Sequence, residues 1–364
     1  MLSTGGDEVT EAVAGLVALL RPALDRDWAK TGAGPLEWSC RRTAEHIASD
    51  LIAYAGQLAG QAKSAYVPFL ISIDGREGGL APADNAGILD VLTTTGALLG
   101  AAVRTAPRNA RGFHPYPFRS ANREGFAAMG IAEVLLHAYD IAQGLDLAYE
   151  PPAHLAEFVL TRIFPEVRPG PDPWQTLLWA TGRADLPGRP RLTEWHWTNN
   201  HVLDTTRLRL EGVSPAAAAD LSTGGTGGFD WIEGGPFDGT REAAGMVGKA
   251  YEAGVHRPEF GLYVLVRRED DRAVGGIGFH GVPDEDGKAE IGYDLAEAAR
   301  GNGYATEALR KLAEWALARD DVRSLFATVE PHNTPSQAVI ARAGFTKVSE
   351  ELDEEGLQAY ELRP

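Results

Sequence analysis

The sequence contains one cysteine, Cys40, in 364 residues. A single thiol excludes an internal disulfide framework and suits a reducing compartment. The first residues lack the basic segment and long apolar run of a secretory signal peptide, so we expect a cytoplasmic protein. No stretch approaches the roughly 18 uninterrupted apolar residues that cross a bilayer, and we expect no membrane partner.

Basic side chains are in deficit. The chain has 34 Lys and Arg against 51 Asp and Glu, a formal net charge of −17. This balance argues against nucleic acid as a partner, because neutralising phosphates requires clustered Lys and Arg. The acidic excess favours a cationic acceptor through long-range attraction, and it is equally a common means of staying soluble.

The remaining composition is that of an ordinary globular protein, with 44% hydrophobic and 23% charged residues. At this length, two domains are expected. The sequence pattern changes near Asn199–Thr205, which places the domains at residues 1–200 and 201–364. The oligomeric state is left open.

The first half has apolar residues at helical spacing and almost no strand-like alternation. This pattern predicts an all-α domain, an antiparallel helical bundle with long crossovers, followed by an extension. The extension begins with a further helix at Ala153–Phe164 and continues as a Pro/Gly-rich, Trp-containing tail, residues 168–197. The four main helices are expected at Glu8–Leu20, Thr43–Leu58, Pro82–Arg104 and Asn122–Gln143.

The second half alternates strand-like and helix-like segments, which predicts an α/β domain with a mixed sheet. A Gly-rich stretch, Thr223–Gly239, raises the question of disorder. Helices are expected at Tyr304–Arg319 and Pro335–Ala343. Strands are expected at Arg207–Leu210, Gly261–Arg267, Ala273–Gly281, Ala289–Leu295, Ser324–Val329, Thr346–Ser349 and Ala359–Leu362.

One segment of this half has the features of an anion site. A strand ends at Leu295, and Arg-Gly-Asn-Gly-Tyr-Ala at 300–305 opens the following helix. Gly301 and Gly303 remove side chains where a ligand approaches the backbone, and the first helical N–H groups are unpaired. Such a turn suits a pyrophosphate, although the glycines alone fit a simple tight turn equally well.

The segment closely resembles the acyl-CoA-binding motif of the GNAT acetyltransferases, Gln/Arg-x-x-Gly-x-Gly/Ala after a splayed strand. Arg300, Gly303 and Ala305 occupy the motif positions. Residues 330–345 resemble a second block of this superfamily, Asn-x-x-Ser before Gly-Phe. Residues 206–210 are similar to the entry strand of the ribosomal-protein-alanine acetyltransferase branch.

The resemblance implies an acetyl-CoA-dependent N-acetyltransferase. Backbone N–H groups near Leu295 and across 301–305 would bind the pantetheine and the pyrophosphate. The implied acetyl-CoA-binding residues are Asp294, Leu295, Arg300, Gly301, Asn302, Gly303, Tyr304, Ala305, Asn333 and Ser336.

The resemblance also implies catalytic roles. Glu290 occupies a position where several family members have the base that accepts the amine proton, although it could equally be an exposed strand carboxylate. The backbone N–H of Leu295 would stabilise the oxyanion. Many members have a Tyr seven residues after the Asn as the acid, and here that residue is Ile340. Either Tyr304 or another group donates the proton, or the thiolate leaves unaided, since a thiol has an ordinary pKa of about 8.5.

The first half contains a candidate metal site. Glu133 and His137 are four residues apart and share a helical face, and His46 lies on another helix with an apolar face. Two imidazoles and a carboxylate would leave a fourth position open, as a catalytic zinc requires. Asp140 could be a ligand or support one. A Glu-x-x-x-His pair is also a common salt bridge on a helix.

Residues 38–47 and 132–142 resemble the DinB-like, mycothiol-dependent maleylpyruvate isomerase family. Residues 173–183, with Trp195 and Trp197, resemble its C-terminal extension. The resemblance implies a four-helix bundle that binds a divalent metal, zinc in the first instance, through His46, Glu133 and His137. In that family the metal lowers the pKa of a low-molecular-weight thiol.

Three hypotheses follow. The first is an N-acetyltransferase acting on a primary amine of a small molecule or protein, fused to a metal-binding helical domain. The second is a metal- and thiol-dependent isomerase or S-transferase with an accessory acetyltransferase. The third is a sensor or scaffold bundle that recruits the acetyltransferase. Acceptor choice depends on variable loops, here residues 222–254, and no residue there identifies the acceptor.

Overall fold

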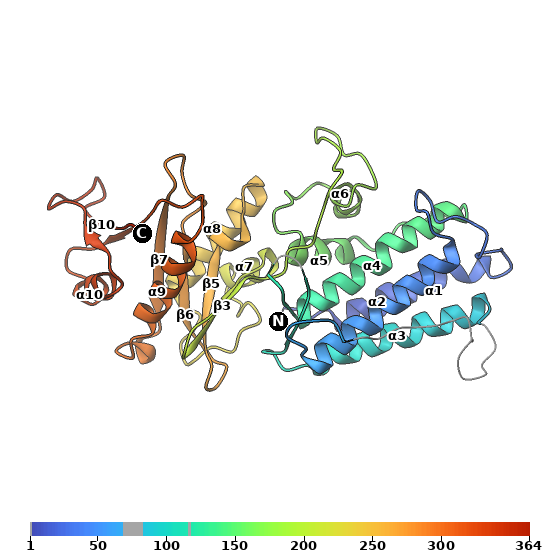
Figure 1. The fold of residues 1–364 in the computed structure, drawn as a ribbon, viewed down its shortest axis with the longest axis horizontal. Coiled ribbons are helices and arrows are strands. Elements are labelled where there is room, and N and C mark those ends of the chain that lie inside the picture. Colours follow the sequence, from blue (N-terminus) through green and yellow to red (C-terminus); the bar gives the residue numbers. More distant parts are fainter. Residues whose placement is uncertain (1, 68–82, 116–117) are drawn as a thin grey trace. The chain divides into compact units, whose positions relative to one another are not determined.

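The computed structural model of the protein describes residues 2–67, 83–115 and 118–364 (Figure 1). The chain divides into two compact units, Ser3–Asn199 and Asn200–Pro364, and Leu2 belongs to the latter. The division lies beside the boundary expected from the sequence. The two units have separate hydrophobic cores.

The first unit is helical, as expected. Its long helices pack on one another around a core of Leu, Ile, Val and Ala side chains. Two short strands, β1 and β2, pair antiparallel beside them. The elements are α1 Gly6–Leu20, the short 3₁₀ helix η1 Arg21–Ala23, α2 Cys40–Gly60, α3 Asn85–Thr105, β1 Arg111–Gly112, β2 Ala121–Asn122, α4 Arg123–Gly144, α5 Ala153–Ile163 and α6 Pro173–Ala180.

Polar caps set the starts of α2, α3 and α4. Ser39 accepts a hydrogen bond from the backbone N–H of Arg42, Asp84 from Gly87 and Asn122 from Gly125. Each cap satisfies one of the unpaired N–H groups of the first turn. Pro82, expected to begin the third helix, lies outside the described residues.

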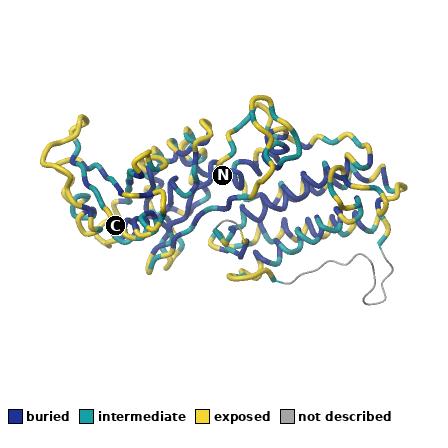
Figure 2. Tube along the Cα trace, turned by 45° about the horizontal axis from the view of Figure 1, so that its top comes forward, coloured by how far each residue is buried: buried dark blue, intermediate teal, exposed yellow. Residues whose placement is uncertain are grey.

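Helices α3 and α4 are long and apolar enough to cross a membrane by length and composition alone. The apolar window of α4 is 94% buried inside the unit, and that of α3 is 44% buried. Burial of this kind is typical of the core helix of a bundle (Figure 2). The absence of a membrane partner stays a prediction.

The Trp-containing tail has a helix that the sequence pattern did not predict, α6. Its N-cap, Asp172, accepts a hydrogen bond from the backbone N–H of Gln175, and Pro173 occupies the first turn. Trp174 packs edge-on against the rings of Tyr139 and Tyr149, with centroids 5.8 and 5.9 Å away. The surrounding prolines and glycines hid the helical pattern of these eight residues.

The second unit is an α/β domain with an eight-stranded mixed sheet, in the order β3-β4-β5-β6-β7-β8-β10-β9. Pairing is antiparallel except between β7 and β8. Helix α9 packs on one face of the sheet, and α7 and α8 on the other. The strands are β3 Val202–Asp204, β4 Leu208–Gly212, β5 Leu262–Arg267, β6 Ala273–Phe279, β7 Lys288–Leu295, β8 Ser324–Val329, β9 Thr346–Lys347 and β10 Gln358–Leu362. The helices are α7 Pro215–Ser222, α8 Asp238–Ala253, α9 Tyr304–Leu317 and α10 Thr334–Arg342, with the short 3₁₀ helices η2 Pro258–Phe260 and η3 Glu297–Ala299.

The Gly-rich stretch 223–239 adopts a defined path between α7 and α8. Phe229 and Trp231 are buried in the core, and the Trp231 indole N–H donates to the carbonyl of Thr226 at 2.9 Å. The Asp220 carboxylate accepts from the N–H of Gly227 at 2.8 Å. Two buried aromatic rings and these bonds hold the loop in place.

Helix α8 was also missed, because Gly245 and Gly248 lie inside it and lower its helical propensity. Both glycines have open space where a side chain would be. The opposite face supplies a buried stripe that packs on the sheet, made by Thr240, Ala244, Val247 and Tyr251.

Candidate functional site

An opening in the sheet of the second unit lies between β7 and β8. The parallel pairing runs from Lys288 opposite Ser324 to Glu290 opposite Phe326. Strand β7 continues to Leu295, where it remains paired with Gly275 of β6. The second half of β7 is therefore held by β6 alone and diverges from β8.

Peptide groups of β7 point into this opening. The N–H of Ala296 donates to Val274, and the N–H of His280 donates to the carbonyl of Glu290. Backbone groups alternate along an antiparallel strand, so those of Tyr293 and Leu295 face away from β6. The N–H groups of these two residues are thus available to a ligand lying between β7 and β8.

The turn after β7 leads into helix α9 with bare backbone. Gly301 and Gly303 have φ angles of +76° and +77°, a conformation that other residues adopt only with strain. No described atom lies within 4 Å of the place where a Gly301 Cβ would be. Helix α9 starts at Tyr304 without a capping side chain among the described residues. Its first N–H groups and its dipole favour an anion here.

Arg207, which the sequence pattern did not single out, is bonded to this turn. Its guanidinium donates to the carbonyl of Asn302 at 2.7 Å and pairs with Glu307 at 2.6 Å. Glu307 also accepts from the hydroxyl of Thr205 at 2.6 Å. These contacts fix the glycine turn and bring a cation to within 3.5 Å of a Cβ built on Gly303. An arginine in the short turn before β4 gives no local signal of such a role.

A groove of about 830 Å³ lies beside the end of β7. Phe237 and Gly239 from the start of α8 form one wall, and Leu295 and Arg300 belong to the other. The volume falls in the range of small-molecule sites. The bend after Leu295 is thus open to a ligand.

Asp294, one of the expected acetyl-CoA-binding residues, directs its carboxylate toward α8. The two oxygens accept from the hydroxyl and N–H of Thr240 at 2.6 and 2.9 Å, and from the N–H of Gly276 at 3.0 Å. The side chain therefore joins α8 to the sheet. Only the backbone of Asp294 remains for a cofactor.

Helix α10 brings Ser336 to the opening. Its hydroxyl lies 2.7 Å from the hydroxyl of Tyr293 on β7, a residue that the sequence pattern did not single out. Asn333 caps α10 by accepting from the N–H of Ser336 at 3.2 Å. Ile340, where many family members have a Tyr, is buried in the core. Tyr304 is also buried, with the Arg207 guanidinium 4.9 Å from its ring.

Glu290 has a partner that the sequence did not indicate. His280, at the end of β6, has Nδ1 3.4 Å from Oε2 of Glu290, and the hydroxyl of Thr328 on β8 donates to Oε1 at 3.1 Å. The side chains of His280 and Glu290 are 45% and 37% exposed, so both can meet a substrate. Nε2 of His280 would lie 2.7 Å from a Cβ on Gly292, so a side chain at position 292 would displace the imidazole from its place over β7.

The two groups change each other's protonation. The hydrogen bond from His280 holds the pKa of Glu290 below its ordinary value. The same contact raises the pKa of His280. The result is a carboxylate–imidazole pair whose imidazole is a stronger base than an isolated histidine.

In the first unit, His46, Glu133 and His137 converge. Their ligand atoms lie within 4.8 Å of one another. Oε2 of Glu133 is 3.5 Å from Nε2 of His46 and 3.3 Å from Nε2 of His137. Bonds of about 2.0–2.1 Å to a tetrahedral zinc would place ligand atoms roughly 3.3–3.4 Å apart. The donor set and the two distances from Glu133 to the imidazoles fit a zinc ion.

Asp140 supports the site from behind and is not a ligand in this arrangement. Its buried carboxylate accepts from Nδ1 of His137 at 2.9 Å and from Arg183 at 2.9 and 3.1 Å. The contact turns Nε2 of His137 toward the other two ligands, as carboxylates commonly do for metal-binding histidines. Burial opposes charge on Asp140, but the bonds from His137 and Arg183 keep its pKa below the ordinary value.

Asp50 and Trp38 complete the surroundings of the cluster, and neither was identified in the sequence. Oδ2 of Asp50 is 3.3 Å from Nε2 of His46, one helical turn away. Burial, followed by the charge of Glu133, raises the pKa of Asp50 to about 7. The Trp38 ring packs edge-on to that of His46 at 4.9 Å.

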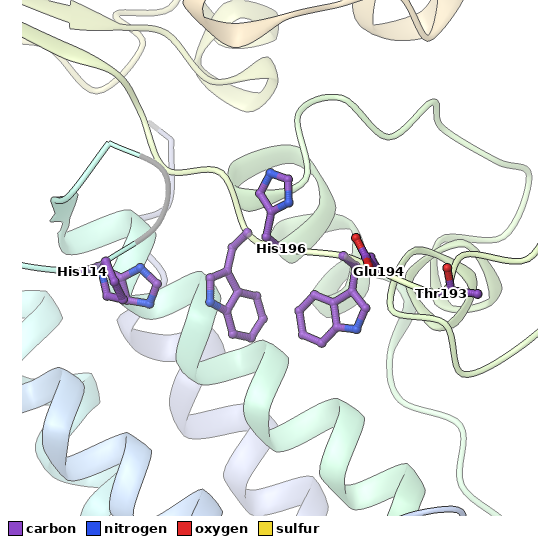
Figure 3. A pocket seen from close by; sticks show the side chains of 7 residues that line it. His114, Thr193, Glu194 and His196 are labelled. Carbon is purple, nitrogen blue, oxygen red and sulfur yellow. The ribbon is translucent and has the colours of Figure 1, made fainter.

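The first unit also has a groove, with a volume of about 640 Å³. It lies between the segment 193–197 and His114 (Figure 3). Trp195 and Trp197, whose rings are 5.1 Å apart, contribute to its wall. The His114 ring packs edge-on to Tyr54 at 6.5 Å. The groove is large enough for a small molecule.

Comparisons with known proteins concern the second unit. The family described as acetyltransferase (GNAT) domain matches residues 207–346. The uncharacterized N-acetyltransferase YjdG of Bacillus subtilis is 40% identical over 86 residues, 24% of this chain and 51% of that protein. The uncharacterized N-acetyltransferase p20 of Bacillus licheniformis is 36% identical over 85 residues, 23% of this chain and 48% of that protein.

The chain thus spans about half the length of these curated relatives. The solved acetyltransferase of Agrobacterium tumefaciens str. C58 is 26% identical, and the match covers 49% of this chain and 100% of that one with a TM-score of 0.33. The second half of the chain contains an acetyltransferase domain of the GNAT type, a domain of acyltransferase enzymes.

Proposed function

We propose that the protein transfers the acetyl group of acetyl-CoA to a primary amine of a small molecule or a protein. The observation that carries this proposal is the opening between β7 and β8, which continues into an uncapped helix start beside an open groove. The opening suits an extended thioester arm, and the helix start suits its pyrophosphate.

The residues present fit acetyl-CoA. Gly301 and Gly303 leave room for phosphate oxygens against the backbone, and the N–H groups that begin α9 donate to them. Arg300 supplies positive charge at the same turn. Arg207, whose charge is paired with Glu307, holds the turn through the carbonyl of Asn302. Tyr293, Leu295 and Ser336 line the path of the thioester arm.

The His280–Glu290 pair provides the base. An amine must lose its proton to attack a thioester, and Nε2 of His280 lies over the β7 backbone near the opening. As the new C–N bond forms, the amine proton passes to Nε2. Glu290 holds Nδ1 and stabilises the imidazolium that results.

Groups that border the opening stabilise the negative charges that develop on the thioester oxygen and on the leaving thiolate. The N–H of Leu295 donates to the thioester oxygen, on which negative charge develops. As the C–S bond breaks, the hydroxyl pair of Tyr293 and Ser336 supplies a proton to the thiolate. Because a thiol has an ordinary pKa of about 8.5, this proton transfer is helpful but not essential.

The test is release of free CoA by the full chain with a panel of primary amines. We expect CoA release to depend on the amine and to fall about a hundredfold in His280→Gln, the usual scale of a lost general base. Glu314→Gln, which alters an exposed carboxylate on α9, is the matched control. Turnover that survives His280→Gln would contradict the role of the pair.

We further propose that the first unit binds one divalent metal ion, zinc in the first instance, through His46, Glu133 and His137. The spacing of the three ligand atoms supports this proposal. A zinc ion in this position could lower the pKa of a bound thiol. Asp140 and Arg183 orient His137, and Asp50 places a carboxylate oxygen 3.3 Å from Nε2 of His46.

The DinB-like resemblance, with its mycothiol-type cofactor, and a sensor or scaffold role both remain alternatives for this unit. The groove at Trp195 and Trp197 would bind the thiol cofactor under the first alternative and the sensed ligand under the second. Acetyl transfer should be measured with and without a metal chelator. Loss of transfer with the chelator would mean that the metal-binding first unit is required, and unchanged transfer would mean that it is accessory. The single buried thiol, Cys40, is compatible with the cytoplasmic location that we propose.

A further inference from the structure

Helix α8 begins at a residue that cannot cap it. The side chain of its N-cap, Phe237, accepts no hydrogen bond, and Asp238, Gly239 and Thr240 form the first turn. The first N–H groups of a helix have no partner inside the helix, so they need an acceptor from elsewhere. This helix start also matters to the site, because Phe237 and Gly239 belong to the wall of the groove of about 830 Å³.

The acceptor comes from strand β7. Oδ2 of Asp294 accepts from the N–H of Thr240 at 2.9 Å, and Oδ1 accepts from the hydroxyl of Thr240 at 2.6 Å. Oδ1 also accepts from the N–H of Gly276 on β6 at 3.0 Å. Thr240 is buried, so water has little access to it as an alternative partner. One carboxylate thus joins the first turn of α8 to β6 and to the end of β7.

Two glycines allow α8 to approach the strands closely at this point. A Cβ on Gly276 would lie 2.7 Å from the hydroxyl oxygen of Thr240, and a Cβ on Gly239 would lie 3.1 Å from Oδ2 of Asp294. Neither glycine has a positive φ, so the contact uses the missing side chain and not an unusual backbone conformation. A side chain at position 276 would push the Thr240 hydroxyl away from the carboxylate.

Asp294 directly precedes the residue that stabilises the oxyanion in the proposed reaction, Leu295. An oxyanion donor is effective when its direction is fixed before the reaction begins. The pairing of β7 with β8 ends at Glu290, so the last part of β7 depends on β6 and on its other attachments. The bonds of Asp294 attach it to α8 one residue before the donor.

We infer that Asp294 is a positioning residue for acetyl transfer. Its carboxylate fixes the end of β7 against the first turn of α8, and thereby sets the direction of the Leu295 N–H toward the thioester oxygen. The side chain acts through Leu295 and does not exchange a proton with the substrate. This assignment rests on the acetyl transfer proposed above.

The test uses two variants that weaken the same contact from its two sides. Thr240→Val removes the hydroxyl donor, and Asp294→Asn replaces one acceptor oxygen by an NH2 group that faces an N–H. At saturating acetyl-CoA and amine, we expect kcat of the full chain to fall about tenfold in each, with the KM for the amine changed by less than about twofold. Thr240→Ser keeps the hydroxyl and should retain most of the wild-type kcat.

A second helix cap in the same unit provides the matched control. Ser214 caps α7 by accepting from the N–H of Ala217 at 3.3 Å, and Ser214→Ala removes that bond. Lost helix-end bonds should lower the melting temperature of all three destabilised variants. Well below that temperature, Ser214→Ala should keep its kcat. A purely structural role for Asp294 predicts that Asp294→Asn and Thr240→Val also keep theirs.

The pH profile separates positioning from proton transfer. If Asp294 accepted the amine proton, Asp294→Asn would displace the rising limb of kcat/KM. As a positioning residue, it should leave the limb where His280 sets it and lower only the plateau. An unchanged kcat in both variants, or a displaced limb, overturns the positioning role alone. A wild-type protein that transfers no acetyl group to any amine overturns the proposed function and the positioning role together.

Discussion

Nδ1 of His280 lies 3.4 Å from Oε2 of Glu290. Glu290 lies on β7, and His280 directly follows the neighbouring strand β6. The backbone N–H of His280 donates to the carbonyl of Glu290, so the pair is fixed by the strand register as well as by its side chains. The imidazole occupies space that Gly292 leaves free. A base is thus placed over the strand that borders the opening in the sheet.

The first prediction concerns pH. His280 acts as a base only when it has lost its proton, so kcat/KM should rise as pH passes upward through its pKa. Glu290 raises that pKa. Glu290→Gln removes the carboxylate and should move the rising limb to lower pH, besides lowering the maximal rate. Profiles of both proteins with the same amine measure this directly; a limb that stays in place or moves to higher pH would show that His280 is not the titrating base.

The second prediction concerns the glycine turn. Gly303 has a φ of +77°, so Gly303→Ala and Gly303→Glu share the same backbone strain, about 1–2 kcal/mol. Only the glutamate adds bulk and negative charge at the expected pyrophosphate. Calorimetry should show acetyl-CoA affinity more than tenfold weaker in the glutamate variant than in the alanine variant. Equal affinities would mean that the turn does not contact the cofactor.

The third prediction concerns the hydroxyl pair across the opening. Tyr293 and Ser336 lie 2.7 Å apart, so Tyr293→Phe and Ser336→Ala each break the same contact. We expect each variant to lower kcat by less than about tenfold, because the thiolate can leave unaided, and the double variant to lose no more than the worse single one. Additive losses would argue against a shared role for the two hydroxyls.

The turn at residues 300–305 was predictable because its physics is local. Two glycines, the end of a strand and the start of a helix occupy one continuous segment, and the structure places them together as expected. Glu290 was identifiable for the same reason, as a residue of the strand before the turn. His280 was not, because its contact with Glu290 depends on the register between two strands.

The candidate metal cluster was likewise predictable from the sequence only in part. The spacing of Glu133 and His137 is visible along one helix, and the structure brings His46 to them from α2. Asp50 could have been found, since it lies four residues after His46 on the same helix. Arg183 reaches Asp140 from the segment after α6, and no spacing in the sequence indicates that contact.

The fourth prediction concerns this cluster. The purified full chain should contain about one zinc or similar ion, and His46→Ala should lose it, because two ligands bind a divalent ion far more weakly than three. Elemental analysis measures the content. His154→Ala, which alters an exposed histidine of the same unit, should keep the metal. A wild-type protein that stays metal-free after zinc is supplied would exclude the site.

The most direct test of the whole account is the release of CoA from acetyl-CoA by the full-length protein in the presence of primary amines, with acetylated product identified by mass spectrometry. The account predicts amine-dependent turnover with one acetyl group transferred for each CoA released, and its loss in His280→Gln. A protein that neither binds acetyl-CoA nor acetylates any amine of the panel would contradict the reading of the opening between β7 and β8 as an acetyl-CoA site.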